Sequence, residues 1–335
     1  MQEGQPLAFF PSINPPIQPL PIKWYTSFFQ HLVFVSKPRA SIASPFEHEG
    51  EKPKCYAERW NMSPMMDPPF DPQYIMKAIK SAPSLVPNSD PLDFPVPVYH
   101  INPSTVVKAC SPEALIAEAL SMHMVRTMTT IPVPPLKQLI AGAEIRRHYL
   151  VMDYIPGRAL NTCWSELGFF AQLRIAWILR GYVSQLRRLQ RSVPGRIDGS
   201  ECEGHLWPII GEDPFESYEH LASWYNHKID VSHRAGKAPA TDFRYDTSWP
   251  LVFTHGDISP RNIILADDGL LYLIDWRFAG FYPVWHEHTS MVWDSSDFQL
   301  PSSWQRWISF IAGDYSDMAL KSHLLCWGIK VAYLA

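Results

Sequence analysis

The segment His255-Gly256-Asp257-Ile258-Ser259-Pro260-Arg261-Asn262-Ile263 carries an aspartate and, five positions later, an asparagine. A second aspartate, Asp275, follows Asn262 by thirteen residues and ends an apolar run. Between the two lies Asp267-Asp268-Gly269, a strong signal for a tight turn. We therefore predict a hairpin of strands 263–266 and 270–274, which brings Asn262 and Asp275 together.

The types and spacing of these polar residues suit phosphoryl transfer. That reaction needs an acceptor hydroxyl in line with the phosphate, and cations that neutralise the phosphate charge. A loop carboxylate such as Asp257 can accept or orient the hydroxyl, and Asn262 and Asp275 can ligate Mg²⁺ through hard oxygens. Their order along the chain is that of the kinase catalytic loop and metal-binding aspartate.

Residues 255–262, followed by Ile274-Asp275-Trp276 and Ala279-Gly280-Phe281-Tyr282-Pro283, resemble the aminoglycoside phosphotransferase and choline kinase-like family, most of all its fungal members of unknown substrate. The resemblance covers about 96–310. It implies an α+β, two-lobed protein kinase-like fold with a small strand-rich N-lobe and a mainly helical C-lobe. It also implies ATP and Mg²⁺ as cofactors and a small-molecule hydroxyl as the phosphate acceptor.

The same resemblance implies a role for each residue of the motif. Asp257 is expected to be the catalytic base or the residue that orients the hydroxyl. Asn262 and Asp275 are expected to bind Mg²⁺, and His255 to support the loop rather than take part in the chemistry.

A lysine upstream completes the expected nucleotide site. Val106-Val107-Lys108 has the character of the kinase strand lysine, which acts as a point charge on the α- and β-phosphates. Such a lysine needs a carboxylate to hold it. Glu118, ten residues later in a predicted helix, is the preferred partner, and Glu113 is the alternative. Lys108 and Glu118 are thus the predicted cofactor-binding residues.

Three further features bear on nucleotide binding. Residues 151–157 resemble the hinge between lobes, where backbone groups would meet the adenine. The turn 102–105, before Lys108, has no glycine, although a kinase phosphate cover usually needs glycine for close backbone approach. Arg277 follows the metal aspartate closely, and we expect it either to weaken Mg²⁺ binding or to contact a phosphate.

Proline content divides the chain. Eighteen of the 32 prolines fall in residues 1–100, and they favour extended conformations. We expect a proline-rich, partly disordered arm over 1–90 with a short helix near 72–81, an N-lobe that binds nucleotide over 91–156, and a helical C-lobe with the catalytic loop and acceptor site over 157–335. The expected strands are 96–101, 105–108, 148–154 and 251–254, and the expected helices are 111–128, 169–190 and 215–234.

Composition excludes several classes of function. A net charge of −4 does not favour nucleic-acid or anionic-membrane binding, and no apolar stretch approaches the roughly 20 residues of a membrane span. The five cysteines form no C-x-x-C pair, which disfavours a zinc site or a disulfide framework. We expect a cytoplasmic protein with neither nucleic acid nor membrane as a partner; the sequence does not fix its oligomeric state.

Other motifs in the sequence do not favour a different function. His286-Glu287-His288 lacks the i, i+4 histidine pair of a helical metal site, so a supporting or substrate-pocket position is favoured. There is no P-loop and no nucleophile elbow. The main alternative to an active enzyme is a nucleotide-binding pseudokinase that acts as a scaffold or regulator; a protein kinase is disfavoured because no A-P-E segment follows Asp275.

Overall fold

The computed structural model describes residues 70–85, 97–141, 148–208 and 211–330. The chain divides into two compact units, Met1–Ile42 and Ala43–Ala335, and every described residue belongs to the second. Most of the predicted proline-rich arm, and the predicted strand start at Val96, therefore lie outside the described residues.

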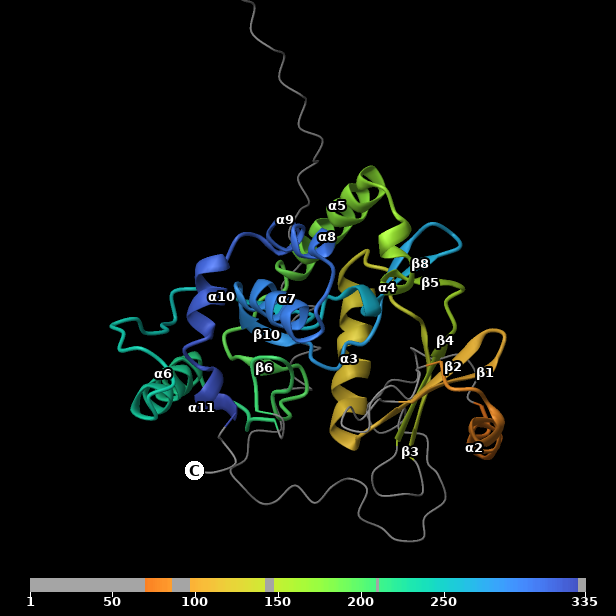
Figure 1. The fold of residues 1–335 in the computed structure, drawn as a ribbon. Coiled ribbons are helices and arrows are strands. Elements are labelled where there is room, and N and C mark those ends of the chain that lie inside the picture. The colour runs from red at the N-terminus through yellow and green to blue at the C-terminus, as the bar shows by residue number, and fades with distance from the viewer. Residues whose placement is uncertain (1–69, 86–96, 142–147, 209–210, 331–335) are drawn as a thin grey trace, which may run out of the picture. The chain divides into compact units, whose positions relative to one another are not determined.

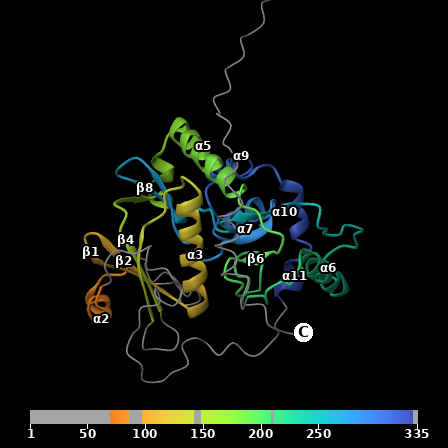
Figure 2. The same cartoon turned by 180° about the vertical axis from the view of Figure 1, so that it is seen from behind.

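The first part of the second unit is an antiparallel sheet of four strands in the order β1-β2-β4-β3. These strands are β1 Val98–Asn102, β2 Thr105–Cys110, β3 Leu136–Ala141 and β4 His148–Asp153. Two helices pack on it, α2 Pro72–Ser81 and α3 Pro112–Met128. In both views α3 lies between this sheet and helix α7, His286–Asp297, of the second part (Figures 1 and 2).

Side chains of β2 alternate between two faces of the sheet because successive residues of a strand point in opposite directions. Val107 and Ala109 form a buried apolar cluster with Ile75 of α2 and with residues of β3 and β4. Lys108, between them, has the opposite direction and contacts α3. All six residues of β2 are buried, so the charged end of Lys108 lies inside the protein.

The start of α3 follows the predicted signals. The Ser111 hydroxyl accepts the Ala114 N–H at 3.2 Å, Pro112 occupies the first helical position, and Glu113 lies in the first turn. The predicted helix over 111–128 is confirmed, and with it the position of Glu118 in the middle of the helix.

The second part is mainly helical, with two small sheets in the orders β6-β10-β7 and β5-β8-β9. Its helices are α4 Leu160–Cys163, α5 Phe169–Leu186, α6 Tyr218–Arg234, α7 His286–Asp297, α8 Ser302–Gln305, α9 Ile308–Ala312, α10 Ser316–Ser322 and α11 Cys326–Lys330. Its strands are β5 Gly157–Ala159, β6 Gly195–Arg196, β7 Leu251–Thr254, β8 Ile263–Ala266, β9 Leu271–Leu273 and β10 Gly280–Pro283.

This arrangement confirms the predicted α+β plan of a strand-rich part followed by a helical part. The hairpin β8–β9 is antiparallel as predicted, with Ile263 opposite Leu273. Two helix boundaries differ from the prediction. Helix α5 ends at Leu186 rather than 190, because Gln190 bridges to Val252 of β7, and α6 begins at Tyr218, where the Ser217 hydroxyl accepts the His220 N–H.

Aromatic residues build the core beneath α6 and α7. Trp207, from the segment between β6 and α6, packs its ring against Tyr225, Tyr282 and His286 at centroid distances of 5.4 to 5.9 Å. Trp285 is also buried there and belongs to the same core. Within the described ranges, no helix combines the length and apolar character that crossing a bilayer requires.

Candidate active site

The predicted catalytic loop joins β7 to β8. It runs from His255 through a 3-10 turn at Pro260–Asn262. Gly256 has φ of 78°, and a Cβ atom there would lie 2.8 Å from the carbonyl oxygen of Phe278. Only glycine fits this close approach, which fixes the direction in which the loop leaves the strand.

His255 lies beneath the loop and is fully buried. The Asp257 N–H donates to His255 Nδ1 at 3.2 Å, so Nε2 carries the proton and donates to the Ile274 carbonyl at 3.2 Å. Burial lowers the pKa of this imidazole, which keeps it neutral. His255 thus links the loop to the end of the hairpin, which is a supporting position and leaves it no free nitrogen for chemistry.

Asp257 is surrounded by hydrogen-bond donors. Its Oδ2 accepts Asn262 Nδ2 at 2.7 Å, and its Oδ1 accepts an Arg261 N–H at 2.5 Å. His205 Nε2 lies 3.1 Å from the same Oδ1. Arg261 also donates to Asp294 Oδ1 at 2.6 Å. The carboxylate therefore keeps a fixed orientation, and Oδ2 is the oxygen with fewer partners.

The hairpin brings Asn262 and Asp275 to one end. The Ile274 N–H donates to the Asn262 carbonyl at 3.0 Å, and Asp275 follows with φ of 64°, in the left-handed region that non-glycine residues seldom adopt. Both hydrogen bonds of the Asn262 side chain use Nδ2. Within the described part of the chain, no hydrogen bond uses Asn262 Oδ1 or Asp275 Oδ2.

Lys108 connects the sheet to this site. Its ammonium donates to both Glu118 carboxylate oxygens at 2.8 Å and to Asp275 Oδ1 at 2.7 Å. Burial alone would lower the pKa of Lys108, but Asp275 and Glu118 raise it above its ordinary value, so the lysine is charged. Glu113 is exposed. The structure therefore pairs Lys108 with Glu118 and not with the alternative partner.

The acid end of this arrangement remains ionised and accessible. Burial would raise the pKa of Asp275, but Lys108 outweighs it and the pKa is lowered. The Asp275 side chain is still 37% exposed. Two free hard oxygens, Asn262 Oδ1 and Asp275 Oδ2, are the donor set that Mg²⁺ prefers. The residues present therefore fit a bound magnesium ion.

The glycine-free turn 102–105 joins β1 to β2, as predicted, and lies beside the end of β4. Thr105 lies opposite Asp153 at the end of β4, and the Ser104 carbonyl accepts the Tyr154 N–H at 3.1 Å. Lys108 is three positions away along the strand, roughly 10 Å. The turn therefore lies at the end of the sheet where β4 leads into residues 154–157. The end of β1 opposite Lys108 is Val98.

A second buried lysine, Lys137, joins the turn 102–105 to the end of β4. Lys137 Nζ donates to the Ser104 carbonyl at 2.9 Å and to the Thr105 hydroxyl at 3.0 Å, and it pairs with Asp153 Oδ1 at 2.7 Å. Lys137 was not predicted as a site residue. In the sequence it lies in an apolar run just after Pro134-Pro135, and the strand that contains it, β3, was not predicted either.

Arg277 is held by a partner from outside the motif. Its Nε and one terminal nitrogen lie 2.7 and 2.6 Å from Glu203 Oε2, and its guanidinium lies over the Phe278 ring. Glu203 also accepts from Arg196 at 3.0 Å. Arg277 thus stays close enough to Asp275 to lower its pKa, yet its guanidinium is largely engaged.

The segment His286-Glu287-His288 has a supporting place, as favoured from the sequence. Glu287 of α7 accepts the backbone N–H groups of His255 and Gly256 at 2.7 and 3.1 Å. Burial raises the pKa of Glu287 to about 7. His286 is packed among aromatic rings, and His288 contacts the Ser309 hydroxyl at 3.2 Å. The three side chains contact different groups and do not converge on one metal.

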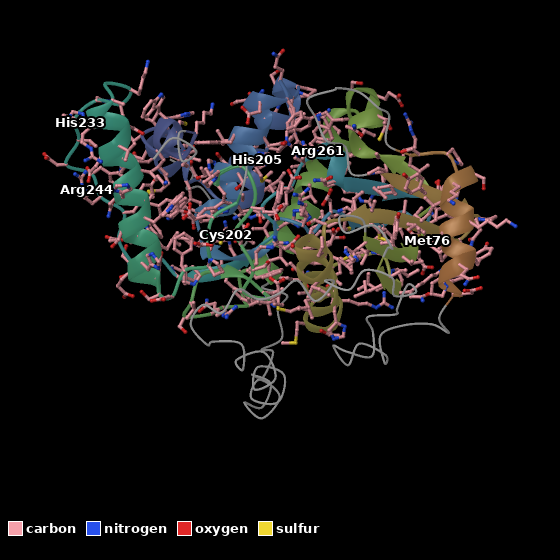
Figure 3. The ribbon with its side chains drawn as sticks, turned by 90° about the horizontal axis from the view of Figure 1, so that it is seen from below. Met76, Cys202, His205, His233, Arg244 and Arg261 are labelled. Carbon is pink, nitrogen blue, oxygen red and sulfur yellow. The ribbon has the colours of Figure 1, made fainter. Side chains whose placement is uncertain are left out.

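His205 and Asp294 also lie at this site, although neither was predicted from the sequence. Together with Asp257 they offer ligand atoms within 4.8 Å of one another, a spacing that a metal ion could bridge. Arg261 already supplies a cation between the two carboxylates. Figure 3 shows His205 and Arg261 close together in the middle of the view, although more than 50 residues separate them in the sequence. No local sequence pattern marks His205 or Asp294 as a site residue.

Among solved structures, aminoglycoside phosphotransferase APH(4)-Ia is 10% identical, with a TM-score of 0.46 over 76% of this chain and 86% of that one. A type VIII aminoglycoside-3'-phosphotransferase is 16% identical, with a TM-score of 0.44 over 76% of this chain and 99% of that one. A GDP and kanamycin complex of another such enzyme is 12% identical, with a TM-score of 0.47 over 76% and 86%.

A search of curated proteins gives no match. The family model is more informative because it spans both the lysine strand and the catalytic loop. It matches residues 97–318 of the 335, well over half of the chain, and its description is the phosphotransferase enzyme family. The chain therefore belongs to the phosphotransferase enzyme family.

Proposed function

We propose that this protein transfers the γ-phosphate of ATP, with Mg²⁺, to a hydroxyl group of a small molecule. The observation that carries the proposal is the contact of Lys108 with both Glu118 and Asp275, beside the Asp257–Asn262 pair. In this proposal residues 91–156 bind the nucleotide, and residues 157–335 supply the catalytic loop and the acceptor site.

The nucleotide would lie between the hinge and Lys108. The Tyr154 N–H and the Pro156 carbonyl are used within the protein. Within the described residues, no hydrogen bond uses the backbone N–H or carbonyl of Ile155, so these groups are available for the edge of the adenine. At the other end, the Lys108 ammonium provides the positive charge for the α- and β-phosphates.

Asn262 and Asp275 would hold the magnesium ion through Oδ1 and Oδ2. When bound, the ion neutralises charge on the β- and γ-phosphate oxygens. The Lys108 ammonium would then contact the phosphates instead of Asp275. Glu118 would keep its hydrogen bonds to Lys108 and so hold the lysine side chain in place. Asn262 stays fixed because its Nδ2 donates to the Asp257 carbonyl at 3.0 Å.

The chemical step needs one proton acceptor. The acceptor oxygen forms a bond to the γ-phosphorus, and the bond from that phosphorus to the bridging oxygen breaks, leaving ADP with the electron pair. The hydroxyl proton moves to Asp257 Oδ2, the oxygen that is not occupied by Arg261 and His205. Positioning and charge neutralisation supply most of the rate in this class of reaction.

A transfer assay tests the proposal. The protein is incubated with labelled ATP, Mg²⁺ and pooled acceptors, namely aminoglycosides, choline, homoserine and sugars. Asp257→Asn is the test variant, and Asp267→Asn, an exposed carboxylate on the turn of the hairpin, is the matched control. We expect ADP release that depends on an acceptor, a loss of at least about 100-fold in Asp257→Asn, and no change in the control.

The other outcomes separate the alternatives. ATP binding without transfer to any acceptor would favour a pseudokinase that acts as a scaffold or regulator. No binding of nucleotide at all would contradict both proposals.

A further inference from the structure

The segment between β6 and α6 brings three consecutive residues, Glu203-Gly204-His205, onto the catalytic loop. Glu203 pairs with Arg277, and the His205 ring packs edge-on against Phe278 at 6.0 Å. Gly204 has φ of 126°, and a Cβ atom there would lie 3.2 Å from the Phe278 ring. The three residues therefore pack against Arg277 and Phe278.

This packing places the His205 side chain beside Asp257, the proposed catalytic carboxylate. Its Nε2 lies 3.1 Å from Asp257 Oδ1 and 3.6 Å from Asp294 Oδ1. The His205 side chain is largely buried, as are both carboxylates. With Arg261 on the same Oδ1, the histidine completes the set of donors on one side of Asp257. Among the described residues, the other oxygen, Oδ2, accepts only from Asn262 Nδ2.

The charged groups around His205 decide whether its imidazole is protonated. Burial alone would lower the pKa of His205, but Asp257 and Asp294 raise it above its ordinary value, and Arg261 opposes them weakly. His286 of α7 is the other titratable neighbour, and burial lowers its pKa to about 3, so it stays neutral. The protonated imidazole is therefore the form that this site stabilises.

We propose that His205 is a positioning residue for the transfer reaction: by donating to Asp257 Oδ1, it fixes the carboxylate so that Oδ2 meets the acceptor hydroxyl. The inference rests on the proposed phosphotransferase function. It makes the segment between β6 and α6, which lies outside the catalytic motif, part of the assembly of the base.

Steady-state kinetics test the role of His205. We expect His205→Ala to lower kcat between about tenfold and 100-fold, because a misplaced base loses its alignment with the hydroxyl. The KM for ATP should change less than about twofold, because Lys108, Asn262 and Asp275 are untouched. His205→Gln, which can still donate a hydrogen bond, should recover part of kcat. His227→Ala, an exposed histidine on α6, is the matched control and should behave as wild type.

An NMR titration tests the contact without requiring turnover. The imidazole resonance of His205, assigned by its loss in His205→Gln, is followed with pH in the wild type and in Asp257→Asn. We expect the pKa of His205 to fall in Asp257→Asn, because its hydrogen-bond acceptor loses its charge. An unchanged pKa, or a wild-type kcat in His205→Ala, overturns the proposal. If no acceptor is phosphorylated, the proposed function fails, while the titration still decides whether His205 holds Asp257.

Discussion

Arg277 is the residue whose effect can be predicted most directly from its contacts. Its guanidinium is engaged by Glu203, and it lies near enough to Asp275 to lower the pKa of that carboxylate. Of the two roles expected from the sequence, weakening of Mg²⁺ binding is therefore favoured over phosphate contact. Such a charge near a partly exposed site is worth on the order of 1 kcal/mol.

We therefore predict that Arg277→Gln lowers the Mg²⁺ concentration at half-saturation by about three- to tenfold, because Asp275 gains negative potential. The measurement is a Mg²⁺ titration of ADP release at fixed ATP. Arg244→Gln, an exposed arginine paired with Asp230, is the control. A rise in the KM for ATP with unchanged Mg²⁺ dependence would instead identify Arg277 as a phosphate ligand.

At the scale of elements, α7 and the catalytic loop are joined by the two backbone hydrogen bonds to Glu287. Burial raises the pKa of Glu287 from an ordinary value of 4.5 to about 7 in the folded protein. The folded state therefore prefers the protonated acid. Its contribution to stability is complete below pH 4.5 and is lost as the pH rises to about 7, by at most about 3 kcal/mol.

Glu287→Gln should remove this dependence, since an amide does not titrate. We expect the free energy of unfolding of the wild type to fall, relative to the variant, as the pH rises from about 4.5 to about 7. Denaturant titrations at several pH values measure it. Glu216→Gln, an exposed acid before α6, serves as the control. A parallel pH dependence in wild type and Glu287→Gln would mean that Glu287 is ionised throughout.

The elements also explain which parts of the site could be predicted from the sequence. Lys108 and Glu118 lie in a strand and a helix with clear periodic and capping signals, and ten residues of regular structure bring them together. Asn262 and Asp275 are joined by a two-stranded hairpin with an unambiguous turn. In each pair the geometry is local, so spacing together with the family resemblance was sufficient to select these residues, with Glu113 left as the alternative to Glu118.

His205, Asp294 and Lys137 could not be found in this way. His205 lies in an irregular segment, and its partner Asp257 is 52 positions away, so no periodicity connects them. Lys137 acts through the register of β3 and β4, which depends on tertiary pairing. The position of the turn 102–105 beside the end of β4 could not be predicted either, because it depends on the pairing of β2 with β4.

At the scale of the whole molecule, Lys108 joins the N-terminal sheet to the catalytic hairpin through Glu118 and Asp275. Lys108 and Glu118 are buried, so removing the lysine leaves two carboxylates facing each other without their cation. Loss of one partner from a buried ion pair typically costs about 3–5 kcal/mol. Because Asp275 is partly exposed and solvent screens it, the lower end of that range is expected here.

We therefore predict that Lys108→Met lowers the melting temperature of the ligand-free protein, whereas Lys77→Met, an exposed lysine on α2, leaves it unchanged. Mg²⁺ alone should restore part of the loss in Lys108→Met, because a divalent cation on Asp275 replaces the missing charge, while it should stabilise the wild type little. ATP with Mg²⁺ should stabilise the wild type by about 2.7 kcal/mol at a hundredfold excess over Kd, and so raise its melting temperature. The melting temperature of the variant should rise much less. These shifts are measured by thermal unfolding with and without each ligand. A variant that nucleotide stabilises as strongly as the wild type would mean that Lys108 contacts no phosphate and serves only to join the two parts of the fold.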